Sequence, residues 1–322
     1  MQRKTINKRI KSKMEEWLAT IPAELAKKVR PNIVVSGGSI ASMFLREDVN
    51  DYDVYLMDMD VLLELCKFYG DKHGVNTLDG RKRDKMLQDQ YGWTPGEPVP
   101  AFQDGEDEYQ SEHFVRLRSL RSDQIKMDTG TGKRIDQTKN TNENGEIIPF
   151  SVKFISPNAI SLNNDVQLVC RFSGSVDDIH KTFDFIHATN YFTFETGVVT
   201  NIQALESLLT KQLKYQGSLY PVTSIIRAKK FIKRGWNIGA GEYLKIMFQI
   251  SELALTDPVV LEDQLIGVDV AYFGMLIDIL KAKYEKEPDF KLTSPYLNEV
   301  IDKVFNEDLD DDSHPDQIDF DV

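Results

Sequence analysis

The chain has 322 residues, a formal net charge of −12 at pH 7, and 41% hydrophobic residues. This length and composition favour one or two globular domains and exclude a chain that is disordered throughout. No apolar run approaches the roughly 18 residues that a membrane span needs, and the N-terminus is charged where a signal peptide would be apolar. We therefore expect a soluble, cytoplasmic protein with no membrane partner.

The negative charge is concentrated at the C-terminus. Eight acidic residues lie in the last 17 positions, which contain no Lys or Arg. Without these eight acids the formal net charge of −12 falls to −4, so the body of the chain is nearly balanced. We expect residues 306–322 to form a disordered acidic tail, and the total charge alone does not exclude a nucleic-acid partner.

The first part of the chain predicts an α/β unit. Residues 1–30 carry helical apolar spacing interrupted by Pro22, and a core follows over residues 31–200. The elements expected at the start of this core are a strand at 33–35, a glycine turn, a helix at 40–46, a strand at 51–56 and a helix at 61–69. This order is typical of proteins that handle nucleotides.

The remaining elements are less regular. Residues 80–150 are expected to be an insertion, with loops at 93–100 and 130–145 and short strands at 115–120 and 124–128. Core strands are expected at 151–155 and 166–172, with 183–186 continuing the sheet. A helical domain is expected over 201–305, with helices at 202–211, 222–234, 241–254, 274–284 and 294–305. The predicted fold class is thus α+β: a mixed sheet with flanking helices, followed by an all-helical C-terminal part.

Two cysteines indicate the redox compartment. Cys66 and Cys170 each lie in an apolar run, and neither has a CxxC partner. They are interpreted as reduced core thiols of a cytosolic protein, not as a disulfide or a zinc site.

The residues that suggest chemistry are Gly37-Gly38-Ser39 and, 12 residues later, Asp51-x-Asp53. A glycine pair between a strand and a helix lets the backbone approach a triphosphate, and the helix N-terminus directs free N–H groups at phosphate oxygens. Ser39 can add a hydroxyl contact to the same phosphates.

Asp51 and Asp53 are two apart on a predicted strand, so both side chains face one side. Two adjacent carboxylates repel each other unless a cation lies between them. The expected cofactor is therefore Mg²⁺ (or Mn²⁺), held by Asp51 and Asp53 beside the triphosphate of an NTP.

This combination resembles the DNA polymerase beta superfamily of nucleotidyltransferases, and within it the tRNA CCA-adding enzyme and the head domain of bacterial poly(A) polymerase. Residues 166–172, which end in Arg171-Phe172, and Phe183-Asp184-Phe185 are similar to two further motifs of that group. Residues 226–231 with Gly235-Trp236 look like its neck helix. Residues 183–192 also look like nucleotidyltransferase-like proteins of tailed phages.

The resemblance implies a third carboxylate in the metal site. The matching position holds Gln167, so we predict Asp184 as this ligand, with Asp128 as a weaker candidate. His180 and His187 flank Asp184 and are interpreted as core histidines, because no further ligand keeps metal-site spacing. The basic neck helix adds Arg227 and Lys230 as predicted nucleotide-binding residues, although a solvated helix face explains it equally well.

Two departures limit what the resemblance carries. The group has Arg-Asp soon after its glycine pair, where this chain has Ala41-Ser42. Its nucleotide-templating motif aligns with Tyr220, Pro221 and Ser224, which cannot read a base in the same way. The base preference therefore does not carry over.

The predicted function is metal-dependent transfer of a nucleoside monophosphate from an NTP to a hydroxyl, with an RNA or tRNA 3′ end as one candidate acceptor. The alternative is a catalytically inactive protein that reuses the fold for binding or structure, such as a phage virion or assembly component. A third hypothesis is a toxin- or defence-type transferase that modifies tRNA or protein.

Overall fold

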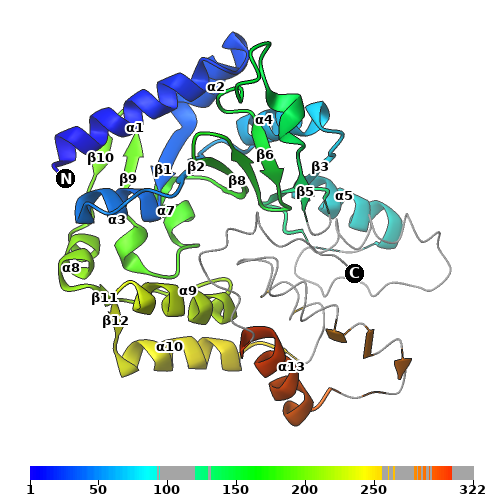
Figure 1. Ribbon diagram of the computed structural model, residues 1–322. Helices are drawn as coiled ribbons and strands as arrows, with labels where there is room; N and C mark the ends of the chain where they lie inside the picture. The colour runs from blue at the N-terminus through cyan, green and yellow to red at the C-terminus, as the bar shows by residue number, and fades with distance from the viewer. Residues whose placement is uncertain are drawn as a thin grey trace. The chain divides into compact units, whose positions relative to one another are not determined.

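The computed structural model describes residues 1–92, 94, 120–129, 132–255, 260, 264, 279–280, 282–283, 286–287, 290 and 292–306 (Figure 1). The expected acidic tail, apart from its first residue Asn306, lies outside these ranges, as do almost all of the strand expected at 115–120 and most of the helix expected at 274–284. The chain divides into two compact units, Met1–Gly217 and Ser218–Val322. Each unit is described by itself below.

The first unit is built on a mixed sheet, which confirms the predicted α+β class. Within the described part of the chain, its eight strands are, in spatial order, β10 (Gly197–Val199), β9 (Tyr191–Thr193), β1 (Ile33–Ser36), β2 (Tyr52–Leu56), β8 (Val166–Ser173), β7 (Ala159–Leu162), β6 (Val152–Ile155) and β5 (Lys133–Arg134). β2 and β8 run parallel, and the other neighbours are antiparallel. The strands expected near 33, 51, 151 and 166 are present.

Four helices share the main hydrophobic core with one face of this sheet. They are α1 (Arg3–Leu18), α2 (Ala23–Asn32), α3 (Gly38–Leu45) and α4 (Met59–Lys72). Pro22 separates the first two, as predicted, because proline fits the position before a helix but not its interior. Trp17 Nε1 donates to the Tyr69 hydroxyl at 3.0 Å, which joins α1 to α4, and burial raises the pKa of Tyr69 to about 12. Cys66 and Cys170 are free thiols buried in this core.

The opposite face carries a smaller apolar cluster. α7 (Val176–His180) contributes Ile179, which packs with Val34, Tyr55 and Phe183. The serine side chain at the start of α7 and Asp178 cap its first turn reciprocally.

The prediction that residues 183–186 continue the sheet is wrong. Asp184 Oδ1 accepts the backbone N–H of Phe185 at 2.9 Å, a local bond that competes with a strand ladder. Phe185 makes only an isolated bridge to Tyr215, and the 3₁₀ turn η2 (Ile186–Ala188) follows. The sheet is continued instead by β9 and β10, whose three-residue lengths leave too little periodicity to be read from sequence.

The inserted region begins with a helix over residues for which no element was predicted. α5 (Gly80–Tyr91) is mostly charged and buries Leu87, so it lacks the apolar stripe that predicts an amphipathic helix. It follows β3 (Thr77–Asp79), which pairs with β4 (Ile125–Met127). The 3₁₀ turn η1 (Gln137–Asn140) follows β5.

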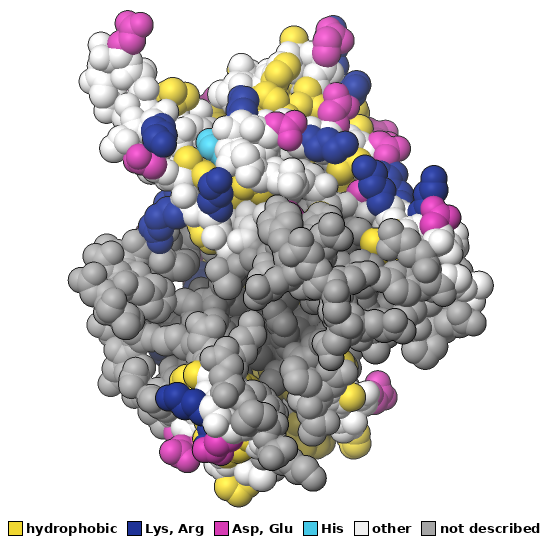
Figure 2. All heavy atoms as spheres, turned by 90° about the vertical axis from the view of Figure 1, so that its right-hand side faces the viewer, with side chains coloured by type: hydrophobic (Ala, Val, Ile, Leu, Met, Phe, Trp, Pro, Cys, Tyr) yellow, Lys and Arg dark blue, Asp and Glu magenta, His cyan; other side chains and the backbone are white. Residues whose placement is uncertain are grey.

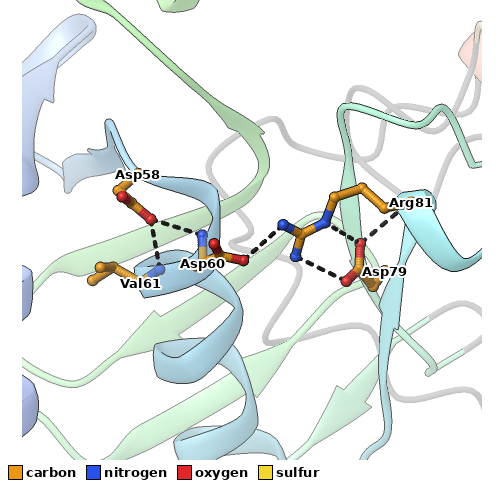
Figure 3. Close-up of polar contacts among 5 residues, drawn as sticks. All are labelled: Asp58, Asp60, Val61, Asp79 and Arg81. Atoms are coloured by element: carbon orange, nitrogen blue, oxygen red, sulfur yellow. Dashed lines mark hydrogen bonds and ion pairs between the residues drawn. The ribbon is translucent and has the colours of Figure 1, made fainter.

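An ion-pair cluster fixes the start of α5 against α4 (Figure 3). Asp79 caps α5 through the Arg81 backbone N–H and accepts two bonds from the Arg81 guanidinium, at 2.9 Å each. The same guanidinium donates to Asp60 in the first turn of α4 at 2.6 Å. Burial opposes ionisation of Asp79, but these bonds and the Arg81 charge hold its pKa below the ordinary value. The cluster thus replaces the missing apolar stripe as the anchor of α5.

Helices follow the sheet, as predicted. α8 (Ile202–Thr210) and β11 (Gln212–Leu213) belong to the first unit. The second unit contains α9 (Pro221–Lys233), β12 (Asn237–Ile238), α10 (Ala240–Ser251) and α13 (Ser294–Asn306). Among the described residues, none of the helices combines the length and the apolar character that crossing a membrane requires.

Candidate active site

The turn between β1 and α3 is built around Gly37. Its φ of +97° and ψ of −153° are open to glycine and strained for other residues. The Gly37 N–H donates to the Ala188 carbonyl at 3.0 Å, and a Cβ on Gly37 would lie 2.7 Å from Asp53 Oδ2. The missing side chain therefore lets the turn touch the Asp53 carboxylate directly.

The N-terminus of α3 opens directly after this turn. A Cβ on Gly38 would meet nothing within 4 Å, so the backbone is accessible there. Ser39 is only 3% exposed, and within the described structure its Oγ has no hydrogen-bond partner. A buried hydroxyl without a partner beside free helix N–H groups is suited to an anion such as a phosphate.

The predicted pair of carboxylates lies where β2 enters the sheet. Ser36, Asp53 and Gln167 are in register on the neighbouring strands β1, β2 and β8, so their side chains share one face. Asp51 is two residues before Asp53 and faces the same way. Asp51 is exposed and Asp53 half-buried, which leaves the pair accessible to a ligand.

Gln167 contacts both carboxylates. One atom of its side-chain amide lies 3.3 Å from Asp51 Oδ2 and 3.0 Å from Asp53 Oδ1. When this atom is the nitrogen, it donates to both acids and relieves their repulsion. The position that the sequence marked as a departure is thus at the centre of the site.

The donor set is compatible with a hard cation such as Mg²⁺, which prefers carboxylate and amide oxygens. Within the described ranges, however, no three His, Cys, Asp or Glu side chains gather closely enough to hold a metal ion. Asp184 lies in the loop after α7 and Asp128 follows β4, and neither joins Asp51 and Asp53 in such a group. The role of Asp184 as a third ligand stays a prediction that this geometry does not support.

His180 contacts Ser36, the residue that precedes the Gly37 turn. Ser36 Oγ lies 2.9 Å from His180 Nε2, 3.0 Å from the Asn190 carbonyl and 3.2 Å from the Ala188 carbonyl. Burial lowers the pKa of His180 to about 4, against the smaller opposing effect of Asp177, so the imidazole is neutral near pH 7. Sequence reasoning noted His180 but not this contact, because its partner is 144 residues away.

The two predicted nucleotide contacts from the neck helix lie elsewhere in the chain. Arg227 and Lys230 are half-buried residues of α9, in the second unit. Their role in nucleotide binding stays a prediction.

Taken together, the mixed sheet, the glycine turn at a helix N-terminus and the paired carboxylates are consistent with a nucleotidyltransferase-like protein. The model of the Gabija anti-defense 2 family matches residues 8–211, which is more than half of the chain. The chain therefore belongs to the Gabija anti-defense 2 family. The matched range contains the whole candidate site.

Individual proteins give a partial likeness. The chain is 27% identical over 144 residues to "Gabija anti-defense 2" of Bacillus phage SPbetaL7, which covers 44% of this chain and 34% of that protein. The chain thus spans about one third of the length of this relative.

Two solved structures are similar at low TM-scores. A tRNA-processing enzyme with CTP shares 13% identity, with 86% of this chain and 57% of that one covered, at a TM-score of 0.35. A Thermotoga maritima CCA-adding enzyme complexed with tRNA shares 10%, with 89% and 58% covered, also at 0.35.

Proposed function

We propose that this protein is a metal-dependent nucleotidyltransferase that a phage uses against the Gabija defence of its host. It transfers a nucleoside monophosphate from an NTP to a hydroxyl acceptor: the acceptor oxygen loses its proton and bonds to the α-phosphorus, the bond to the β-phosphate breaks, and pyrophosphate leaves. The family name supports the biological role, and the site supports the chemistry. The observation that carries the proposal is the close approach of Asp53 to the Gly37 turn, where a Cβ would lie 2.7 Å from Asp53 Oδ2, because it places a carboxylate at the N-terminus of α3.

Each part of the site has a role in this reaction. The free N–H groups at the start of α3 and the Ser39 hydroxyl bind the triphosphate. Asp51 and Asp53 would hold Mg²⁺ or Mn²⁺, which would neutralise charge on the phosphates and lower the pKa of the attacking hydroxyl. The protein then contributes mainly position and electrostatics, because phosphoryl transfer needs little other help.

The described part of the face in Figure 2 does not single out one acceptor. Figure 2 shows Lys and Arg interspersed with Asp and Glu on the described part of the face it presents, where a dedicated nucleic-acid surface would be predominantly basic. RNA and protein acceptors are therefore tested side by side.

The rival function is that of a binding protein that has kept the fold without catalysis. Gln167 in place of a third carboxylate favours it, as does the sequence Tyr220-Pro221 where related enzymes read the base. In this case the protein would act against the defence system by contact alone.

The deciding experiment is incorporation from each labelled NTP, with Mg²⁺ or Mn²⁺, into total RNA, into host protein and into the protein itself. We expect label from at least one NTP, reduced more than about 100-fold in Asp53→Asn, since even outer-shell partners of metal ligands are worth 10–100-fold. Asp53→Asn keeps the side-chain volume, and its circular dichroism and melting temperature confirm the fold.

A plaque assay on cells with and without the Gabija system connects activity to role. Loss of protection in Asp53→Asn supports the enzyme. Full protection by Asp53→Asn, with no label from the wild type, would establish the binding protein instead.

A further inference from the structure

We infer that Gln167 is the third ligand of the metal site, and that its amide serves both states of that site. It donates N–H bonds to Asp51 and Asp53 when no cation is bound, and it supplies its carbonyl oxygen when one is. This inference rests on the proposed function, because it takes Asp51 and Asp53 as metal ligands.

The distances carry the inference. Adjacent oxygen ligands of an octahedral Mg²⁺, with bonds of about 2.1 Å, lie about 3.0 Å apart. One amide atom of Gln167 is 3.0 Å from Asp53 Oδ1 and 3.3 Å from Asp51 Oδ2. The same spacing suits an N–H donor, so a half-turn of the amide exchanges one state for the other without moving the strand.

The pairing of the strands holds Gln167 beside the two carboxylates. Gln167 pairs with Asp53 in the parallel register of β2 and β8, and Ser161 of β7 is in register on its other side. Its neighbours Val166 and Leu168 point into the main core and are at most 2% exposed. The backbone of Gln167 is therefore held rigidly, and only the side-chain torsions remain to choose the orientation.

A second feature of the same corner indicates a ligand. The Gly37 turn leaves room where a side chain would collide with Asp53, and Ser39 Oγ, two residues later, is buried without a partner in the described structure. An open cradle at Asp53 and an orphaned hydroxyl two residues after that turn are expected if a cation and its phosphate occupy this corner together.

The charge of the site follows from this assignment. Two carboxylates and a neutral amide carry −2, which one divalent cation neutralises. A third carboxylate would carry −3 and would attract a cation more strongly before any nucleotide is bound. We therefore expect the free protein to take up one divalent ion, and any second ion to arrive with the triphosphate.

The test is Mn²⁺ binding to the full chain without nucleotide, measured by electron paramagnetic resonance and calorimetry. Relative to wild type, Gln167→Met, which has similar length and no oxygen, should weaken binding about 10-fold or more. Gln167→Glu should tighten binding, and Asp53→Asn should weaken it strongly. Melting temperatures in EDTA verify that each variant is folded. If Gln167→Met does not fold, Gln167→Glu still tests the inference.

Outcomes for the inference and for the proposed function can be separated. Unchanged Mn²⁺ affinity in both Gln167 variants, with a wild type that binds Mn²⁺ and incorporates label, overturns the role of Gln167 and leaves the transferase intact. A wild type that binds Mn²⁺ through Gln167 but transfers no nucleotide keeps the metal site and refutes the transferase. A wild type that binds no Mn²⁺ without nucleotide overturns the role of Gln167, and one that also incorporates no label refutes the transferase as well.

Discussion

The same strands form both faces of the main sheet, but one face packs against the hydrophobic core and the other carries the candidate site. On one face, alternate residues of β2 and β8 such as Val54 and Leu168 are almost fully buried against α1–α4. On the other, the intervening Asp53 and Gln167 form a polar row at the site, beside the smaller cluster around Phe183. Since adjacent strand residues point to opposite faces, substitutions one position apart should separate stability from chemistry.

The largest effect on stability is expected on the core face. Leu168→Ala removes a buried side chain from the main core and should lower the free energy of unfolding by about 2–5 kcal/mol. Val169→Ala, one residue further and half-buried against the smaller cluster, should cost less. Urea denaturation of the two variants measures the difference. Equal losses would contradict the division between the faces.

An intermediate effect is expected at the Gly37 turn, where a substitution should change both stability and nucleotide transfer. Gly37→Ala forces a Cβ into a left-handed conformation and against Asp53, so it should destabilise the fold by about 1–3 kcal/mol. It should also reduce nucleotide transfer by displacing the carboxylate. Gly38→Ala is the matched control for stability, because its Cβ meets nothing within 4 Å. If both alanine variants are equally stable, the close approach of Gly37 to Asp53 is not a real constraint.

The smallest expected effect is a pH dependence of stability caused by His180, which contacts Ser36 next to the Gly37 turn. The folded pKa of His180 is about 4, below the ordinary 6.5, so the unfolded state binds the proton more readily. The stabilising contribution is full above pH 6.5 and is lost as the pH falls toward 4. His180→Gln, which keeps a neutral hydrogen-bonding group, should flatten the decline in melting temperature over this window relative to wild type. Identical profiles for the two proteins would show that His180 does not titrate in this way.

Elements with strong local signals were predictable. The strand at 33–36, the glycine turn, the strand at 52–56 and most of the helices after residue 200 follow from apolar periodicity and glycine placement. The same signals located Gly37, Ser39, Asp51 and Asp53 at one site, because a tight turn and a short connection keep them close in space.

Elements held by distant contacts were not predictable. α5 has no apolar stripe, and the Asp79–Arg81–Asp60 cluster ties its first turn to α4. β9 and β10 are three residues each; β9 pairs with β1, and β10 pairs with β9. The strand expected at 183–186 had a local apolar signal, but the prediction was wrong. The apolar residues there pack from a loop and not from a strand of the sheet.

The sequence by itself determined the glycine turn, the pair of carboxylates and the α+β class, since each depends on residues near one another in the chain. The tertiary structure decided which third group faces that pair. Asp184 had the more suitable chemistry, but Gln167 has the suitable position, because the parallel pairing of β2 with β8 brings a residue 114 positions further along the chain directly beside Asp53. Strand register is set by the burial of a whole face, and a single residue pattern cannot reveal it.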